Sequence, residues 1–205
     1  MKTSKTLFLL AIALASFATY AQKTVSVGAK VGVPNLVSGS AELQLPFLNK
    51  FSVYADLSKF DLATEDLGIE DFSGSLKLNY FEYGANLYLS KPGRGAYISA
   101  GLASFNADAS FFDVALDGTT ETGSGTASIG FNTTNFKFGV KTGGLIYFRM
   151  ELGYAMGSLP QSVSFTARSS SGITETITET FNYDDVPMVS ENGLPLFNIG
   201  LGVSF

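Results

Sequence analysis

The chain has 205 residues, 45% of them hydrophobic and 15% charged, with 18 acidic against 13 basic residues. It has no His and no Cys, which excludes imidazole-activated nucleophiles, thiolate catalysis, disulfides and the usual zinc ligands. The net charge of −5 argues against nucleic-acid binding, which depends on clustered Lys and Arg. We expect one domain, with no cofactor and no metal site.

The first 21 residues have the layout of a secretory signal peptide. Lys2 and Lys5 precede an apolar run at 7–17 that is too short to span a bilayer, and a small-x-small pattern ends at Ala21. We expect cleavage after Ala21, so that residues 22–205 form the exported domain. An uncleaved membrane anchor is the alternative.

The rest of the chain alternates apolar and polar residues with the period of two that is typical of β-strands. The predicted strands are the eight segments 25–33, 41–45, 51–57, 83–89, 98–102, 136–140, 146–154 and 197–205. The fourth is expected to begin earlier, with a bulge near Phe81 that moves its apolar side chains from even to odd positions. Within the last long link, residues 161–181 are predicted to form a hairpin that extends the last two strands.

The links between these strands alternate in length. Short links fall at 46–50, 91–95 and 142–144, and long ones at 34–40, 59–75, 104–135 and 157–195. This all-β pattern predicts an eight-stranded antiparallel up-and-down transmembrane β-barrel, with short turns at one end and long loops at the other. A soluble secreted β-sandwich, which alternates in the same way, is the alternative.

The faces of the predicted strands support a membrane barrel. No apolar row carries a charge, as expected where a charged side chain costs about 2–4 kcal/mol at the bilayer centre. Eight glycines lie on the polar face, where a narrow lumen leaves little room. They are Gly28, Gly32, Gly84, Gly101, Gly139, Gly153, Gly200 and Gly202.

The charged residues of the strands also lie on the polar face. The predicted lumen set has four basic and four acidic members: Lys30, Lys137, Lys141, Arg149, Glu42, Asp56, Glu82 and Glu151. Because unpaired charges are costly in a closed interior, we predict that these side chains pair into a network that fills the lumen. The alternative is that they line a pore or a ligand cavity.

The other 14 acidic residues fall in the long loops, where we expect them to be solvated. Glu65-Asp66 or Asp184-Asp185 could instead bind divalent cations that bridge to lipopolysaccharide. Aromatic side chains near the predicted strand ends are expected to form girdles at the membrane surfaces. They are Phe51, Tyr80, Phe81, Tyr83, Phe136, Tyr154, Phe197 and Phe205.

The segment 198–205 carries a polar residue, a glycine two positions later, and hydrophobic residues third from last and last. In this pattern Asn198, Gly200, Val203 and Phe205 resemble the signal read by the barrel assembly machinery of Gram-negative bacteria. Over residues 24–205 the chain resembles the small eight-stranded outer-membrane barrels, typified by outer membrane protein X and the membrane domain of outer membrane protein A.

This resemblance implies a location in the cell outer membrane, contact with its lipid and lipopolysaccharide, and a structural or surface-interaction role. The hairpin at 161–181 is the candidate site for adding a strand to a surface protein partner. A narrow channel for small or hydrophobic solutes is the alternative. Enzyme activity is not expected, because the barrel enzymes of similar architecture depend on a His.

Overall fold

The computed structural model describes residues 25–63, 73–116, 120–183 and 188–205. The predicted signal peptide lies outside these ranges. The described chain forms ten strands: β1 (Val25–Val33), β2 (Leu36–Gln44), β3 (Phe51–Ala63), β4 (Ser73–Tyr88), β5 (Gly95–Ala115), β6 (Thr122–Gly143), β7 (Ile146–Met156), β8 (Ser162–Ser169), β9 (Thr174–Thr180) and β10 (Gly193–Ser204). No helix in the described ranges is long and apolar enough to cross a membrane.

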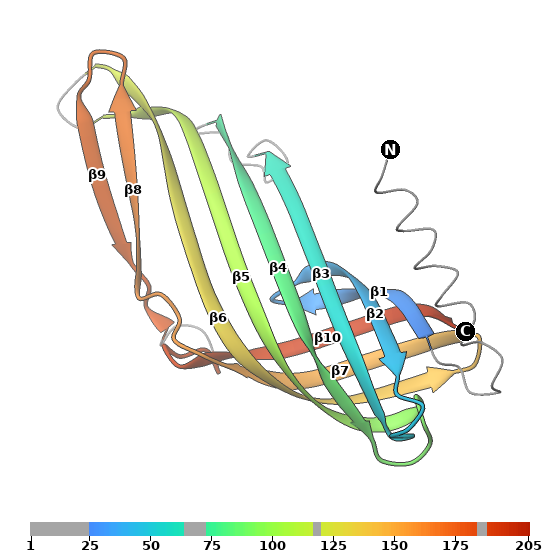
Figure 1. Cartoon of the computed structure of the whole chain (residues 1–205). Helices are drawn as coiled ribbons and strands as arrows, with labels where there is room; N and C mark the ends of the chain where they lie inside the picture. The colour runs from blue at the N-terminus through green and yellow to red at the C-terminus, as the bar shows by residue number, and fades with distance from the viewer. Residues whose placement is uncertain (1–24, 64–72, 117–119, 184–187) are drawn as a thin grey trace.

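Strands β1 to β7 together with β10 form a closed antiparallel barrel of eight strands. Neighbours in sequence pair from β1 to β7, and β10 returns between β7 and β1 (Figure 1). The β1–β10 register runs from Ser26↔Ser204 to Val33↔Phe197 and leaves the barrel without an open edge. The predicted eight-stranded antiparallel barrel is therefore confirmed.

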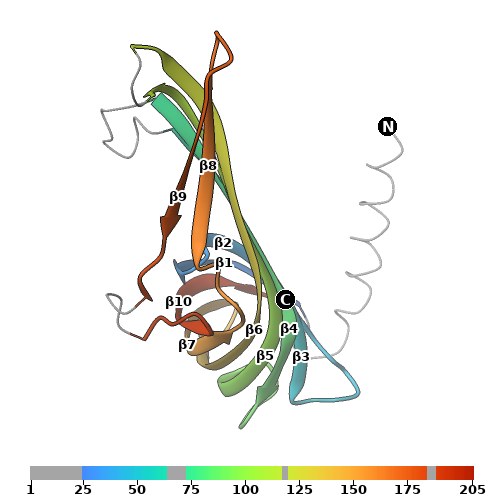
Figure 2. The same cartoon turned by 90° about the vertical axis from the view of Figure 1, so that its left-hand side faces the viewer.

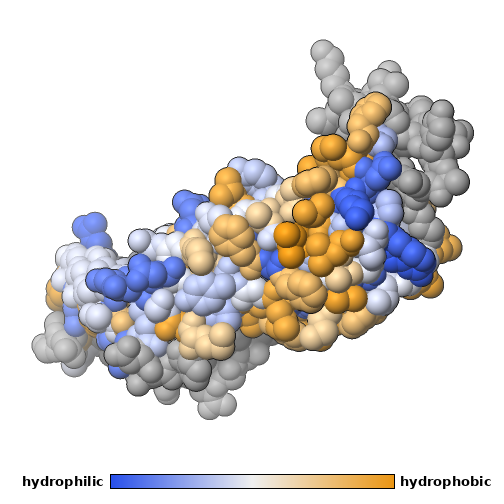
Figure 3. Space-filling model, turned by 90° about the horizontal axis from the view of Figure 1, so that it is seen from below, coloured by the Kyte–Doolittle hydropathy of each residue, from blue (hydrophilic) through white to orange (hydrophobic). Residues whose placement is uncertain are grey.

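The barrel strands turn their polar side chains inward and their apolar side chains outward. On β7, Leu152 is 52% exposed whereas its neighbour Glu151 is 2% exposed. On β1, Val31 is 58% exposed and Lys30 is 2% exposed. Seen from below the barrel, hydrophobic side chains gather in a band that is flanked by more hydrophilic surface (Figure 3). The apolar rows of the sequence thus form the outer wall.

Strands β3 to β6 continue beyond the barrel and build a sheet that we call the extension. The β8–β9 hairpin joins this sheet, because β8 pairs with β6 from Gly123↔Ser169 to Thr126↔Thr166. Figures 1 and 2 show the extension rising from one end of the barrel. We call this the loop end, and we call the opposite end, where residues 45–50, 89–94 and 144–145 connect the strands, the turn end.

The polarity of the two faces reverses in the extension. The register of β5 against β6 is unbroken from Gly95↔Lys141 to Phe111↔Gly125, so each face of the barrel wall continues into the extension. Beyond Ala103, the face continuous with the lumen carries Phe105 and Ala107, and the outer face carries Ser104 and Asn106. The extension therefore has an apolar inner face and a polar outer face, as expected in water.

Aromatic contacts hold this inner face together. The rings of Phe105 and Phe131 stack across β5 and β6 with 5.0 Å between centroids. Phe111 on β5 lies 5.8 Å from Phe165 on β8, which ties the hairpin to the sheet.

Three predictions about the chain outside the barrel core were wrong. The predicted loop at 104–135 consists largely of the far ends of β5 and β6, and most of the predicted loop at 34–40 belongs to β2. The predicted hairpin at 161–181 exists as β8 and β9, but it pairs with β6 instead of extending the last two barrel strands.

The predicted bulge near Phe81 is also absent, because β4 pairs without a register shift with both β3 and β5. Leu76 and Leu78 lie on the inner face of the extension, whereas Tyr83 and Leu87 lie on the outer wall of the barrel. The change from even to odd apolar positions arises from the reversal of polarity along a regular strand.

Candidate functional site in the barrel lumen

The structure places all eight charged side chains of the predicted lumen set inside the barrel. They come from six strands: Lys30 from β1, Glu42 from β2, Asp56 from β3, Glu82 from β4, Lys137 and Lys141 from β6, and Arg149 and Glu151 from β7. Each is between 1% and 4% exposed. Burial at this level requires pairing, because an isolated charge in a low-dielectric interior is very costly.

Glu151 lies at the centre of the network and meets three cations. The Lys30 Nζ atom is 3.1 Å from Glu151 Oε2, the Lys137 Nζ atom is 3.7 Å from the same oxygen, and Arg149 Nη1 is 3.8 Å from Glu151 Oε1. Lys30 also reaches Asp56 Oδ2 at 2.7 Å. These contacts connect opposite sides of the barrel through one carboxylate.

Glu42 forms the second centre, nearer the turn end. Its Oε2 atom accepts hydrogen bonds from Lys141, at 2.9 Å, and from Arg149. Its Oε1 atom accepts hydrogen bonds from the hydroxyls of Ser52, at 2.5 Å, and Tyr88, at 2.7 Å. The basic and acidic side chains of the network are thus equal in number overall. At this end they are not, because the carboxylate of Glu42 pairs with two cations.

Lumen tyrosines complete the network, and their role was not predicted from the sequence. The Tyr54 hydroxyl donates to Glu82 at 2.5 Å, Tyr80 donates to Glu82 at 2.6 Å, and Tyr97 donates to Glu151 at 2.6 Å. The sequence does carry a signal for this role. Tyr54 is two residues from Asp56 and Tyr80 is two residues from Glu82, so each tyrosine lies on the same face of its strand as a predicted lumen carboxylate. The predicted girdle position of Tyr80 was wrong, since this side chain is buried in the lumen.

Each of three lumen tyrosines lies opposite a glycine on the neighbouring strand. Tyr54 pairs with Gly84, Tyr97 with Gly139 and Tyr147 with Gly202. A Cβ atom at Gly139 would collide with the ring of Tyr97, and one at Gly202 would collide with the ring of Tyr147. Because glycine has no side chain, these positions leave the space that the tyrosine rings occupy.

The same rings lie against the cations. Lys137 Nζ is 4.6 Å from the centroid of Tyr54, and Lys141 Nζ is 4.4 Å from that of Tyr147. At the loop end, an apolar cluster of Ala155, Leu159, Leu194 and Leu196 packs with Phe131 of β6, the strand beside β7. The lumen thus contains a layer of paired charges with an apolar layer at its loop end.

Each carboxylate of the network lies against at least one cation. Glu42, Glu82 and Glu151 each accept hydrogen bonds or ion pairs from several donors, whereas Asp56 pairs with Lys30 alone among the described residues. Among the described residues, no group of three or more potential protein ligands is arranged to hold a metal ion. The acidic pairs suggested as cation sites, Glu65-Asp66 and Asp184-Asp185, lie outside the described ranges.

The residues of the predicted assembly signal lie along β10. Asn198 and Gly200 face the lumen, and the Asn198 amide is 3.4 Å from Glu151 Oε2. Val203 is half-buried and Phe205 is exposed. The outer aromatic positions Phe51, Phe81, Tyr83, Phe136 and Phe197 are exposed on the barrel wall, and Tyr154 is partly exposed.

No known protein family and no curated protein matches the chain. Solved structures with a similar fold include two bacterial proteins. CarO of Acinetobacter baumannii is 14% identical with a TM-score of 0.51, over 89% of this chain and 98% of that one. A major outer membrane protein from Thermus thermophilus is 14% identical with a TM-score of 0.54, over the same shares of the two chains. At this identity the likeness shows the fold, that of an outer-membrane β-barrel.

Proposed function

We propose that this protein is an integral barrel of the cell outer membrane with a filled lumen and a structural or surface-interaction role, related in kind to the small eight-stranded barrels. The network centred on Glu151 and Glu42 carries the proposal. It joins side chains from opposite walls and leaves each of them at most 4% exposed. An open channel would require these charges to face water.

The outer wall supports the membrane location. Its apolar rows carry no charge, and their side chains reach 69% exposure at Ile146, which is unfavourable in water and favourable in lipid. Outer-membrane lipid and lipopolysaccharide are therefore the expected surroundings. We expect the barrel assembly machinery to act on β10, the strand that closes the barrel against β1.

The β8–β9 hairpin is the proposed contact with a surface protein partner. Among the described strands, β9 pairs only with β8, so its other edge is open to strand addition. Its sequence, Thr-Glu-Thr-Ile-Thr-Glu-Thr, is polar apart from Ile177, which suits a conditional contact more than a permanent one. No nucleic-acid partner is expected.

Ion conductance across a planar bilayer tests the filled lumen. Residues 22–205 are refolded, and folding is checked beforehand by a heat-dependent shift in gel mobility. We expect a folded barrel that stays electrically silent, with the heat-unfolded sample as the control for detergent artefacts. Steady, reproducible channels would overturn the proposal and favour the alternative, a narrow channel for small or hydrophobic solutes.

A further inference from the structure

The two ends of the barrel carry opposite charge. The short connections of the turn end contain Lys50, Lys91 and Arg94 and no acidic residue. Acidic residues gather instead on the extension and its loops, as at Asp108 and Glu191. A surface of one sign attracts small ions of the other sign, most strongly where it is concave.

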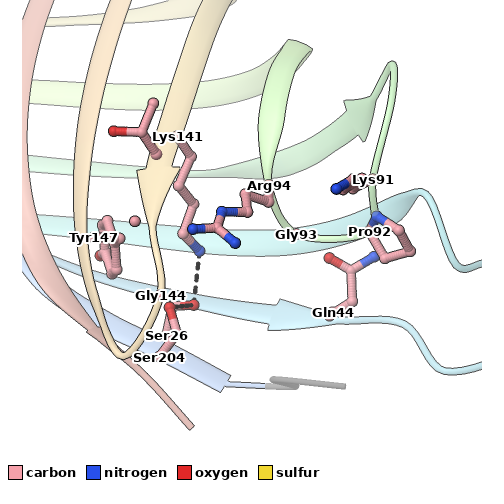
Figure 4. Close-up of a pocket in the computed structure, with 12 residues that line it drawn as sticks. Ser26, Gln44, Lys91, Pro92, Gly93, Arg94, Lys141, Gly144, Tyr147 and Ser204 are labelled. Atoms are coloured by element: carbon pink, nitrogen blue, oxygen red, sulfur yellow. Dashed lines mark hydrogen bonds between the residues drawn. The ribbon is translucent and has the colours of Figure 1, made fainter. Parts of the chain in front are cut away.

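The turn end is concave where the β4–β5 and β6–β7 connections meet the mouth of the lumen (Figure 4). The cavity there has a volume of about 310 Å³. Its walls hold the cations Lys91, Arg94 and Lys141, the hydroxyl residues Ser26, Thr142, Tyr147 and Ser204, and no carboxylate. Figure 4 shows Lys91, Arg94, Lys141, Ser26, Tyr147 and Ser204 around the cavity. Lys141 donates a hydrogen bond to Ser26 at 2.7 Å.

Within the described part of the chain, two of the three cations at this cavity have no ion-pair partner. None of the ion pairs in the described ranges includes Lys91 or Arg94. Lys141 shares its only carboxylate partner in those ranges, Glu42, with Arg149. Three cations therefore line one small cavity, and the carboxylate of Glu42 is already divided between Lys141 and Arg149.

We propose that this cavity binds a phosphate oxyanion. A guanidinium such as that of Arg94 matches two phosphate oxygens at once, Lys91 adds a mobile point charge, and the buried Lys141 supplies a fixed one. The bound anion offsets repulsion among like charges. The phosphate belongs either to the headgroup of a phospholipid on the turn side or to free phosphate, and both present the same oxygens. This assignment does not depend on whether the lumen is closed.

The test uses variants of exposed side chains, because Lys141 is part of the lumen network and its loss would disturb folding. The double variant Lys91→Gln with Arg94→Gln removes the two unpaired cations and keeps their bulk. Lys50→Gln is the matched control, since Lys50 lies in a neighbouring turn and does not line the cavity. All proteins are refolded in nonionic detergent and checked by gel mobility.

Binding is measured by calorimetry at an ionic strength of about 0.01 M, where screening is weak. One arm titrates inorganic phosphate and the other titrates dihexanoyl phosphatidylglycerol. We expect the double variant to bind at least about tenfold more weakly, and Lys50→Gln to bind like the original protein. Binding in both arms identifies free phosphate as sufficient, and binding of the lipid alone identifies a headgroup. Absence of binding in both arms, or equal weakening by Lys50→Gln, would overturn the proposal.

Discussion

The barrel wall and the extension are built from the same strands with opposite polarity. Within the barrel, β5 turns Tyr97 and Ser99 inward and Ile98 outward; beyond it, the same strand turns Phe105 inward and Asn106 outward. The hydrogen-bonding register does not change between the two regions. The backbone register therefore does not decide which face of a strand is apolar; in our proposal the surrounding medium, lipid or water, decides it.

The difference also separates two sources of stability. The wall has lipid outside in our proposal, so its interior is held by ion pairs and hydrogen bonds around Glu151 and Glu42. The extension has water outside, so its inner face is held by apolar contacts such as Phe105 with Phe131. Changes directed at one type of contact should therefore act on one region only.

The largest effect is expected from Glu151→Gln. Loss of this charge leaves Lys30, Lys137 and Arg149 with too few carboxylates in a closed lumen, which should lower the free energy of unfolding by about 3–5 kcal/mol. The exposed Glu179→Gln in β9 is the control and should change it by less than about 0.5 kcal/mol. Urea unfolding in lipid vesicles measures both. Equal stability of the two variants would contradict the central role of Glu151.

A smaller effect should distinguish the outer faces of the two regions. Leu152→Arg places a charge on the wall, where we expect a loss of about 2–4 kcal/mol if the wall contacts lipid. Thr126→Arg makes the same change on the outer face of the extension and should cost less than about 0.5 kcal/mol. The same unfolding measurement applies. A harmless Leu152→Arg would argue for the soluble alternative.

Phe165→Ala should loosen the hairpin and spare the barrel. Its ring meets Phe111 across β8 and β5, and loss of such an aromatic pair costs about 0.5–1.5 kcal/mol beyond the area it buries. Hydrogen exchange of backbone amides is expected to speed up in β8 and β9 and to stay slow in β7 and β10. Faster exchange throughout the barrel would show that the two regions are not independent.

The smallest effect concerns Glu121, which anchors the hairpin tip. Hydrogen bonds from Ser171, at 2.5 Å, and from Ser169 lower the pKa of this exposed carboxyl below its usual 4.5. A lowered pKa stabilises the folded form above pH 4.5, and this contribution is lost as the pH falls through the folded pKa. Carbon NMR titration of Glu121 should give a midpoint that rises in Ser171→Ala. An unchanged titration midpoint of Glu121 in Ser171→Ala would show that Ser171 does not stabilise its carboxylate.

Alternation in the sequence predicts the barrel strands and the inward position of residues such as Lys30 and Glu151, because a strand has only two faces. The same rule fails beyond the barrel, where Ala107 and Ala109 give a weak apolar row and the outer face is polar, so that the region resembles a loop. Tyr80 was misplaced because a tyrosine suits both a membrane surface and a hydrogen-bonded interior. The pairing of β8 with β6 depends on segments far apart in sequence and leaves no local signal.

The tyrosine–glycine pairs have a consequence for how the strands come into alignment. A slip of two residues preserves the inward and outward faces, so polarity alone cannot reject it. In such a slip of β5 against β6, Tyr97 would meet the side chain of Lys137 or Lys141 where it now has the space above Gly139. Each tyrosine ring and the glycine opposite it therefore favour one register of the neighbouring strands. Because the register sets the shear of the barrel, it also sets the diameter of the barrel and the tilt of its strands.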